Sequence, residues 1–395
     1  MNRRTFIKVA AAGALALLTG CGVDKKALDV KHLRQVVTRD ISRSRCIMWQ
    51  VEEPLINPAI EVSNGKIFPA QDATFTDDGK EIIQYTAQVD FADRYRIIDG
   101  EAATAWHELK TPSDKFKAII FPDSQCGGGY ETWGAVARGA FERNPDANFF
   151  VNVGDLVDNG EDNAQWEDWL AQVEEYLPQV PFAPVMGNHE TYSRAWEVRQ
   201  PVAYLNYFAP PDNGFKEFSR RFYSFEVGAA HVAVLDSQWD ELGKEIIDVQ
   251  KNWLREDMQT DKPWKIAFIH KDVLQYRING RPERREGMPD VGEIFMPEFE
   301  SLGVDAVFTG HLHTYRNRGR LKNFQDDEKG TLYILSGLSG NVRYSGLWIN
   351  HALDKTIAPQ PETDNYLVLA GDEKKLSVKC FLPDGELIDE VTLKK

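Results

Sequence analysis

The sequence predicts a small all-β domain followed by a larger α/β domain. From about residue 35 to residue 112, short segments with period-two apolar spacing are separated by Pro, Gly, Asp and Asn clusters, which is typical of a β-sandwich. Beyond that point, apolar strand-like runs alternate with stretches of helical spacing, which predicts helices layered on a sheet. Metal-capable side chains directly follow five of these later runs, so the second domain is expected to carry the functional site.

Composition excludes one class of partner before any motif is considered. The 395 residues have an ordinary globular balance of apolar and charged side chains, enough for about two or three domains. The formal net charge of -15 leaves no broad basic surface that could displace counterions from a phosphate backbone. Nucleic acid is therefore not an expected partner.

Residues 1–21 have the features of an export signal. Arg3 and Arg4 precede the apolar run VAAAGALALL, whose roughly ten residues are half of what spans a bilayer. The segment RRTFIK resembles a twin-arginine signal, and LTGC resembles the lipobox at which bacterial lipoproteins are acylated on cysteine, here Cys21. We expect an exported bacterial lipoprotein of the periplasm or cell envelope, held to the membrane only by its lipid anchor. The alternative is an ordinary secretory signal with an incidental cysteine.

A polar tether is predicted over residues 22–34, ahead of the all-β domain at 35–112. The strand-like segments of that domain are RCIMWQV, AIEVS, EIIQYTAQV and RYRIID. Pro112 lies in a polar run that suits a linker, so the second domain is expected to occupy residues 113–395.

Strands of the second domain are predicted at FKAIIF, ANFFVNV, HVAVLD, KIAFIH and VDAVFTG, and helices at TWGAVARGAFERN and AQWEDWLAQVEEYL. Apolar residues of the second helix recur at helical spacing and are expected to pack on the sheet as core. They are Trp166, Trp169, Leu170, Val173, Tyr176 and Leu177. The segments TLYILSGLSG and NYLVLAGDEKKLSVKCFLPDGELIDEVTL add further strands near the C-terminus.

The residues that follow the strands indicate the site. Because loops from several strands converge at the carboxyl edge of an open α/β sheet, side chains placed there meet in space. Four of the eight histidines of the chain lie at such strand ends. The candidate side chains are Asp123, Asp155, Asn188, His189, His270, His311 and His313.

This mixture of carboxylate, amide and imidazole suits divalent Mn, Fe or Zn better than a thiolate-built structural zinc. The set is too large for one tetrahedral ion, but two ions about 3.5–4 Å apart that share a carboxylate would use all of it. Such a pair lowers the pKa of a bound water from near 15.7 to roughly 7 and makes a clamp for phosphoryl transfer. A histidine outside the ligand set adds roughly 10²–10⁴ in rate by protonating the leaving oxygen.

The blocks PDSQ, GDLVDNG, GNHE, FIH and GHLHTY, in that order, resemble the five blocks of the calcineurin-like metallophosphoesterases. The resemblance implies a four-layer αββα fold with a dinuclear centre. It implies that Asp155 bridges the two metals, that His189 is the general acid, and that Asp158 orients it. The metal ligands that it implies are Asp155, Asn188, His270 and His311 for one ion, and Asp123, Asp155 and His313 for the other, together with whatever Gln125 contributes.

The segments SRSRCIMWQ, DRYRI, FYSFEVGAAHVAVLDSQ and GHLHTYRNR resemble the purple acid phosphatase branch, which implies a fibronectin-III-like N-terminal domain. Two positions depart from that branch. Asp158 replaces the tyrosine that binds a ferric ion, which predicts a non-purple variant. Gln125 replaces a histidine, and its amide oxygen is a weaker ligand than imidazole. We therefore expect a weakened or metal-selective first site, or a glutamine that only hydrogen-bonds a metal-bound water.

Two other features allow more than one interpretation. The basic run YRINGRPERREG, with Arg277 and Arg281, would reach a substrate phosphate or form a solvated loop. Cys46, Cys126 and Cys380 would allow one disulfide of unknown pairing, or remain buried thiols.

Three functional hypotheses follow from these residues. The first is an exported hydrolase of small phosphate monoesters, and the second a phosphodiesterase acting on nucleotides or other small diesters. The third is a metal-binding lipoprotein without catalysis, which the presence of Asp155 and His189 disfavours. The oligomeric state is open.

Overall fold

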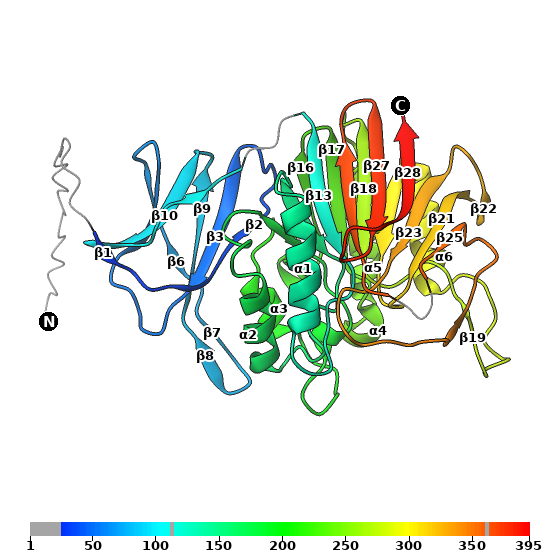
Figure 1. The fold of residues 1–395 in the computed structure, drawn as a ribbon, viewed down its shortest axis with the longest axis horizontal. Helices are drawn as coiled ribbons and strands as arrows, with labels where there is room; N and C mark the ends of the chain where they lie inside the picture. The colour runs from blue at the N-terminus through cyan, green and yellow to red at the C-terminus, as the bar shows by residue number, and fades with distance from the viewer. Residues whose placement is uncertain (1–24, 111–113, 360–362) are drawn as a thin grey trace, which may run out of the picture.

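The computed structural model describes residues 25–110, 114–359 and 363–395, and places a β-rich N-terminal half beside a larger α/β half (Figure 1). The export signal, Cys21 and Pro112 lie outside the described residues. None of the helices in those ranges is long and apolar enough to cross a membrane.

Two facing sheets build the N-terminal half. The first has the order β1-β11-β10-β4-β5, with β12 paired to β10, and the second contains β2, β3, β9 and β6. Apolar side chains of both sheets, such as Trp49, Ile60 and Tyr95, are buried between them. The described strands are β1 (Lys26–Ala27), β2 (Lys31–Val36), β3 (Ser44–Gln50), β4 (Pro58–Val62), β5 (Ile67–Pro69), β6 (Gln71–Asp72), β9 (Gln84–Asp90), β10 (Arg94–Asp99), β11 (Ala102–Ala103) and β12 (His107–Glu108), with a small hairpin of β7 (Phe75–Asp77) and β8 (Lys80–Ile82). The likeness to a fibronectin type III domain stays a prediction.

The predicted tether over 22–34 is wrong in its described part, because β1 and β2 form there. The sequence of β2, KHLRQV, looks polar, yet the Arg34 side chain is fully buried. Its guanidinium donates hydrogen bonds to the backbone oxygens of Tyr207 and His32, at 2.7 Å each. Internal pairing therefore allows a charged residue inside a strand that composition alone assigns to solvent.

A second unexpected feature is that β2 belongs to the main sheet of the α/β half. It pairs in parallel with β15 (Phe182–Pro184), through Phe182 and Val36, and this joins the two halves into one sheet of ten strands. The order of that sheet is β28-β27-β26-β13-β14-β15-β2-β3-β9-β6. Its remaining strands are β13 (Phe116–Phe121), β14 (Phe149–Asn152), β26 (Tyr366–Gly371), β27 (Lys375–Phe381) and β28 (Leu387–Lys394).

A second sheet of eight strands stacks on the ten-stranded one, with the order β16-β17-β18-β20-β23-β21-β22 and with β25 paired to β21. Buried apolar residues of the two sheets, among them Val151 and Ile266, form one core between them. The strands are β16 (Tyr223–Val227), β17 (Ala230–Leu235), β18 (Trp264–Ile269), β20 (Ala306–Thr309), β21 (Tyr315–Lys322), β22 (Gln325–Asp326), β23 (Thr331–Ser336) and β25 (Thr356–Ile357), with β19 (Arg277–Ile278) and β24 (Trp348–Ile349) paired separately.

Helices cover both outer faces of the stacked sheets. Trp133 of α1 and Trp169 of α2 stack on each other at 5.3 Å and pack with Phe121 and Phe150 of the ten-stranded sheet. Trp253 of α5 and Phe295 of α6 pack on the other sheet. The result is a mixed α/β fold in helix, sheet, sheet and helix layers, as expected. The helices are α1 (Glu131–Arg143), α2 (Asn163–Gln172), α3 (Val202–Tyr207), α4 (Trp239–Leu242), α5 (Glu245–Asp257), α6 (Asp290–Leu302) and the 3-10 turns at His189–Thr191 and Lys216–Phe218.

The core assignment of the second predicted helix is confirmed, although α2 ends at Gln172 and the segment from Val173 onward continues as turns. Trp166, Trp169, Leu170, Val173 and Leu177 are fully buried, and Tyr176 is partly buried against the same cluster. These side chains are therefore packing residues.

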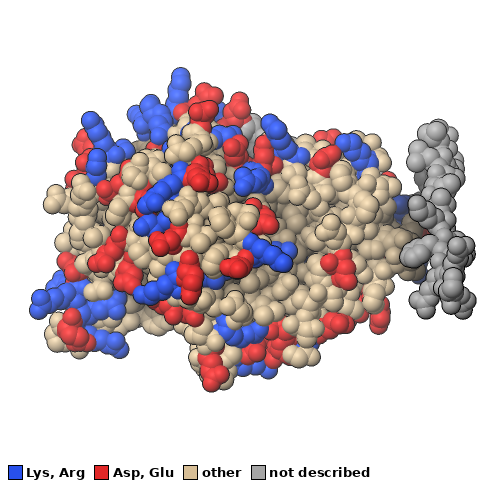
Figure 2. Space-filling view, turned by 180° about the vertical axis from the view of Figure 1, so that it is seen from behind, with Lys and Arg blue, Asp and Glu red and all other residues tan. Residues whose placement is uncertain are grey.

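Charged side chains of both signs are interspersed over the face shown in Figure 2. Mixed charges of this kind are typical of an ordinary solvated surface.

Candidate metal centre

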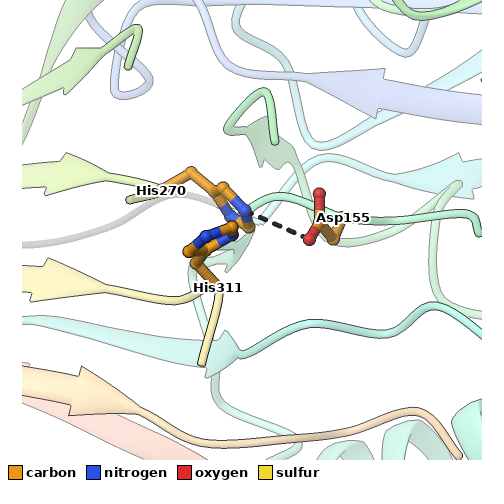
Figure 3. A group of neighbouring side chains, drawn as sticks. All are labelled: Asp155, His270 and His311. Atoms are coloured by element: carbon orange, nitrogen blue, oxygen red, sulfur yellow. Dashed lines mark ion pairs between the residues drawn. The ribbon is translucent and has the colours of Figure 1, made fainter. Parts of the chain in front are cut away.

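Asp155 lies between two groups of side chains that are suited to metal binding. Its carboxylate and the ring nitrogens of His270 and His311 include ligand atoms that all lie within 4.8 Å of one another (Figure 3). A second group with the same spacing contains Asp155, Asp123 and His313. One carboxylate therefore belongs to both groups, which is the arrangement of a bridged pair of ions.

The local topology brings these residues together from two sheets. Asp123 and Asp155 follow the parallel strands β13 and β14, whereas His270 follows β18 of the other sheet. His311 and His313 follow β20, the parallel neighbour of β18. The ligands therefore follow the carboxyl ends of strands in both sheets and meet at one place. The strand pattern had suggested that they all lie at the edge of a single sheet.

Asn188 lies with the first group. Its Oδ1 is 3.2 Å from Nε2 of His270, and that nitrogen is 3.1 Å from Oδ2 of Asp155. An amide oxygen, a carboxylate and an imidazole therefore converge on one point, as the sequence predicted.

Three buried polar atoms near this point have no hydrogen-bond partner: Oδ2 of Asp123, Oε1 of Gln125 and Nδ1 of His311. A buried polar atom without a partner costs roughly 1–3 kcal/mol, so a cluster of them calls for a ligand. All three are lone-pair donors, and this donor set fits divalent cations. The residues present therefore fit two metal ions.

The backbone is held in an unusual conformation at the ligands themselves. The φ angles of Asp155, His311 and His313 are 49°, 76° and 51°, a region that non-glycine residues rarely adopt. Such strain, of order 1–3 kcal/mol per residue, persists where the surroundings enforce it and is common at functional sites. At Gly187 even a Cβ atom would lie 2.2 Å from Oδ1 of Asp155, so only glycine permits this approach.

Backbone carbonyl groups orient the histidine rings. Nδ1 of His270 is 2.8 Å from the oxygen of Val153, and Nδ1 of His313 is 2.6 Å from the oxygen of Val342. A carbonyl oxygen only accepts, so each Nδ1 carries a proton and each Nε2 is the nitrogen that is turned toward a carboxylate and would ligate a metal.

The electrostatics of the ligand set follow from burial. Burial raises the pKa of Asp123 to about 7, with the neighbouring Asp155 charge adding to this effect and His270 opposing it. Burial by itself would lower the pKa of His270, but the Asp155 carboxylate raises it to about 9. Burial lowers the pKa of His313 to about 4, so that imidazole is neutral and able to ligate at ordinary pH.

His189 lies at the edge of the ligand cluster. Its Nδ1 is 2.7 Å from the backbone oxygen of Asp158 and 3.6 Å from the Asp158 carboxylate, so the closer contact is the carbonyl. Its backbone N–H donates to Oδ1 of Asp155 at 2.9 Å. Burial by itself would lower the pKa of His189, but Asp155 and Asp158 raise it above its ordinary value.

The side chain of Gln125 is fully buried and faces this histidine. Its Nε2 is 3.4 Å from Nε2 of His189, while its Oε1 has no hydrogen-bond partner. The amide therefore lies beside the predicted general acid with its oxygen unpartnered, and its metal-ligating role stays a prediction.

Gln125→His is expected to tighten the more weakly held metal by about tenfold or more, because imidazole is a stronger ligand than an amide oxygen for borderline ions. Competitive titration with a coloured chelator measures this affinity. The exposed Gln88→His serves as the matched control. Unchanged stoichiometry and affinity in Gln125→His would argue against a coordinating role.

Glu190 is a site residue that the sequence interpretation missed. Its buried carboxylate accepts hydrogen bonds from the backbone N–H groups of Asp155, Leu156 and Gly187, at 3.0, 2.8 and 2.7 Å. A longer contact of 3.4 Å reaches the N–H of Val157. Glu190 thus ties the loop after β14 to the loop after β15. The sequence feature that could have identified Glu190 is its position directly after Asn188 and His189. Its carboxylate binds backbone N–H groups and so has a structural role.

Glu190→Ala is expected to lower the free energy of unfolding by roughly 3 kcal/mol or more, because several buried N–H groups lose their acceptor. Urea denaturation measures this difference. The exposed Glu174→Ala is the matched control and is expected to stay within about 0.5 kcal/mol of the wild type. A similar small change in Glu190→Ala would show that water replaces the carboxylate freely.

The remaining predicted positions lie away from this cluster. Arg277 is exposed in β19 and forms an ion pair of 3.8 Å with Glu286, and Arg281 is also exposed. Within the described ranges, neither arginine has a hydrogen bond or ion pair with a metal-ligating residue. Their role in substrate binding stays a prediction. Cys46, Cys126 and Cys380 are buried free thiols, so no disulfide joins them.

Comparisons with known proteins agree with this geometry. The family description "Calcineurin-like phosphoesterase" matches residues 106–315. Purple acid phosphatase 15 of Arabidopsis thaliana is 31% identical over 52% of this chain and 38% of its own length. The Fe(3+)-Zn(2+) purple acid phosphatase 12 of the same plant is 27% identical over 56% of this chain and 49% of its length. The chain thus spans less than two thirds of these relatives.

Among solved structures, the purple acid phosphatase PPD1 from yellow lupin (Lupinus luteus) seeds superposes with a TM-score of 0.76. The match covers 93% of this chain and 74% of that chain at 16% identity. At this identity the likeness concerns the fold, and it extends over both the β-rich half and the layered half.

Proposed function

Because the chain belongs to the calcineurin-like phosphoesterase family, we propose that it is an exported phosphatase that hydrolyses small phosphate monoesters at a centre of two divalent metal ions. The observation that carries this proposal is the position of Asp155 in both candidate ligand groups. A carboxylate shared in this way suits two ions at the spacing that clamps a phosphoryl group.

The metals proposed are Mn, Fe or Zn. One ion would be held by Asp155, Asn188, His270 and His311, and the other by Asp123, Asp155 and His313, with Gln125 as a further ligand that we propose for the second ion. When bound, two such ions supply positive charge to the phosphate oxygens and lower the pKa of water enough for attack at ordinary pH. The name of one relative includes iron and zinc. Asp158 in place of a ferric-binding tyrosine favours a centre without the purple colour.

His189 is proposed as the general acid. Its Nδ1 donates to the Asp158 carbonyl, so the free Nε2 edge can hold the proton that the leaving oxygen needs. Nε2 of Gln125 lies 3.4 Å from this nitrogen, and because an amide N–H only donates, it would bond to the neutral ring after the proton has left. The raised pKa of His189 keeps the acid form available near neutral pH.

An ester panel on enzyme of measured metal content tests the proposal. With two metals bound, 4-nitrophenyl phosphate is expected to turn over at least about tenfold faster than bis(4-nitrophenyl) phosphate. Faster turnover of the diester would favour a phosphodiesterase, the second candidate, which the same ligand set can serve. Turnover of neither ester would favour the third, a metal-binding lipoprotein.

Export and lipid anchoring through Cys21 are a separate proposal, supported by the order of the twin-arginine and lipobox motifs. Cys21→Ser is expected to move the protein from the membrane fraction to the soluble periplasmic fraction, because acylation requires the thiol. Fractionation and immunoblotting measure this shift. Retention of Cys21→Ser in the membrane fraction would contradict a lipid anchor at this residue.

A further inference from the structure

Two aromatic rings lie against the histidine proposed as general acid. The ring centroids of Tyr192 and Trp196 are 5.4 and 6.0 Å from that of His189, with interplanar angles of 78° and 87°. The two aromatic rings are themselves 6.0 Å apart. Together they form an aromatic wall beside the His189 ring.

A third ring borders the metal-ligating histidines. Tyr344 lies 4.8 Å from His313, centroid to centroid, at 36°. On the other side, the Tyr192 hydroxyl is 3.4 Å from Nδ2 of Asn188. Each tyrosine therefore contacts a residue that the sequence predicts as a metal ligand.

The conformation of Trp196 is not explained by packing. The residue is 57% exposed, so its ring contributes little to the core. Its φ of 61° places a bulky side chain in the left-handed region, which residues other than glycine rarely adopt. Strain without burial indicates that the position of the ring serves another purpose.

The loop that carries Trp196 is firmly held. Tyr192 and Val198 form an antiparallel bridge, and the backbone N–H of Trp196 donates to the oxygen of Ser193 at 2.8 Å. The same oxygen of Ser193 accepts from Nδ2 of Asn159 at 2.6 Å.

Arg194 ties the loop to two other segments. Its guanidinium pairs with Asp78 at 3.0 Å and with Asp162 at 2.9 Å, and its backbone N–H donates to Glu161 at 2.8 Å. The aromatic wall is therefore organised before any ligand binds, which reduces the entropy lost on binding.

We propose that Tyr192, Trp196 and Tyr344 form a leaving-group subsite that selects phosphate monoesters of planar aromatic alcohols, an inference that rests on the proposed phosphatase function. His189 would protonate the ester oxygen, and Trp196 lies 6.0 Å from the His189 ring, so an aromatic ring bonded to that oxygen would have Trp196 as a neighbour to stack on. The ester P–O bond breaks, the phosphorus takes a hydroxyl from water, and the aryl oxygen takes the His189 proton. The proton that water loses passes to solvent, and His189 is reprotonated from solvent. Stacking of a planar group on an aromatic side chain is worth about tenfold or more in binding.

The kinetic test compares phenyl phosphate with methyl phosphate on Trp196→Ala. Comparing variant with wild type for each ester cancels the intrinsic reactivity of that ester. The kcat/KM for phenyl phosphate is expected to fall at least about tenfold more than that for methyl phosphate. Val198→Ala, in the same hairpin and 48% exposed, is the matched control and should change neither. Equal losses on both esters, or no loss, would overturn the subsite.

A binding test separates this inference from the proposed function. Phenylphosphonate and methylphosphonate are not hydrolysed and differ only in the ring, so calorimetry on the metal-loaded protein reports the subsite even if no ester turns over. Wild type is expected to bind phenylphosphonate at least about tenfold more tightly, and Trp196→Ala to lose this preference. Equal affinity of wild type for the two phosphonates would overturn the subsite.

Trp196→Gly keeps the test valid if the alanine variant folds poorly. Glycine adopts the left-handed conformation without strain, so the melting temperature of the Trp196→Gly variant is expected to equal or exceed that of wild type. Its preference for phenylphosphonate over methylphosphonate is expected to disappear. Retention of that preference in a stable Trp196→Gly would contradict the inference.

Discussion

Asp155→Asn is expected to lower kcat/KM for a phosphate monoester by about 10³-fold or more. It is also expected to lower the metal content below two ions per chain. Asp155 is the one residue in both candidate ligand groups, so the substitution weakens two sites at once. Changes in residues that merely support a ligand already cost about 10–100-fold in affinity or activity, and a shared ligand costs more at each site. Steady-state kinetics and elemental analysis of the same preparation measure both effects.

The Asp155 carboxylate also accepts a hydrogen bond from the backbone of His189, so loss of activity alone would not identify its role. Metal content distinguishes the two explanations, because misplacement of His189 leaves the ions bound. The exposed Asp168→Asn is the matched control and is expected to retain wild-type activity and metal content. Two tightly bound ions in Asp155→Asn would refute the bridging assignment.

His189→Asn is expected to lower kcat for an alkyl phosphate by roughly 10²–10⁴-fold with metal content unchanged, because the leaving alkoxide loses its proton donor. A 4-nitrophenolate leaves readily without a proton, so the loss on 4-nitrophenyl phosphate is expected to be much smaller. Comparing the two substrates on one preparation measures the difference.

The pH profile gives an independent measurement. The pKa of His189 is raised, so its acid form persists above the ordinary histidine range and is lost as the pH rises through the raised value. The wild-type rate on an alkyl phosphate is expected to fall over that interval, and His189→Asn is expected to lack this fall. His107→Asn, in the N-terminal β-rich half, is the control. Equal losses on both leaving groups would point to a structural role for His189 instead.

Much of the metal centre was predictable because the relevant information is local. A buried strand followed at once by a ligand-type residue is a pattern within a few positions, and parallel strands bring their carboxyl ends together. Asp123, Asp155, Asn188, His270 and the two histidines after β20 do lie in one cluster. The layered α/β fold was predictable for the same reason, since apolar spacing identifies which face of each element is buried.

Other parts of the site depend on contacts between distant segments. Glu190 binds backbone N–H groups of a loop more than 30 positions away, and no residue spacing encodes that contact. The closest contact of Asp158 with His189 is through its backbone carbonyl oxygen. Every residue type has this oxygen, so the residue type at position 158 does not predict the contact. The contact between Gln125 and His189 joins residues 64 positions apart, so it too could be seen only in the folded structure.

The sequence by itself determined the element order, the layered fold class, the ligand residues and the order of the motifs, because each rests on side-chain type and short-range spacing. Only the tertiary structure decided that β2 joins the main sheet, that a polar-looking segment is a buried strand, and that Trp196 lies against His189. These features arise from pairing across long stretches of chain. There the burial of a charge such as Arg34, or the strain at Trp196, is compensated by partners that the local sequence does not reveal.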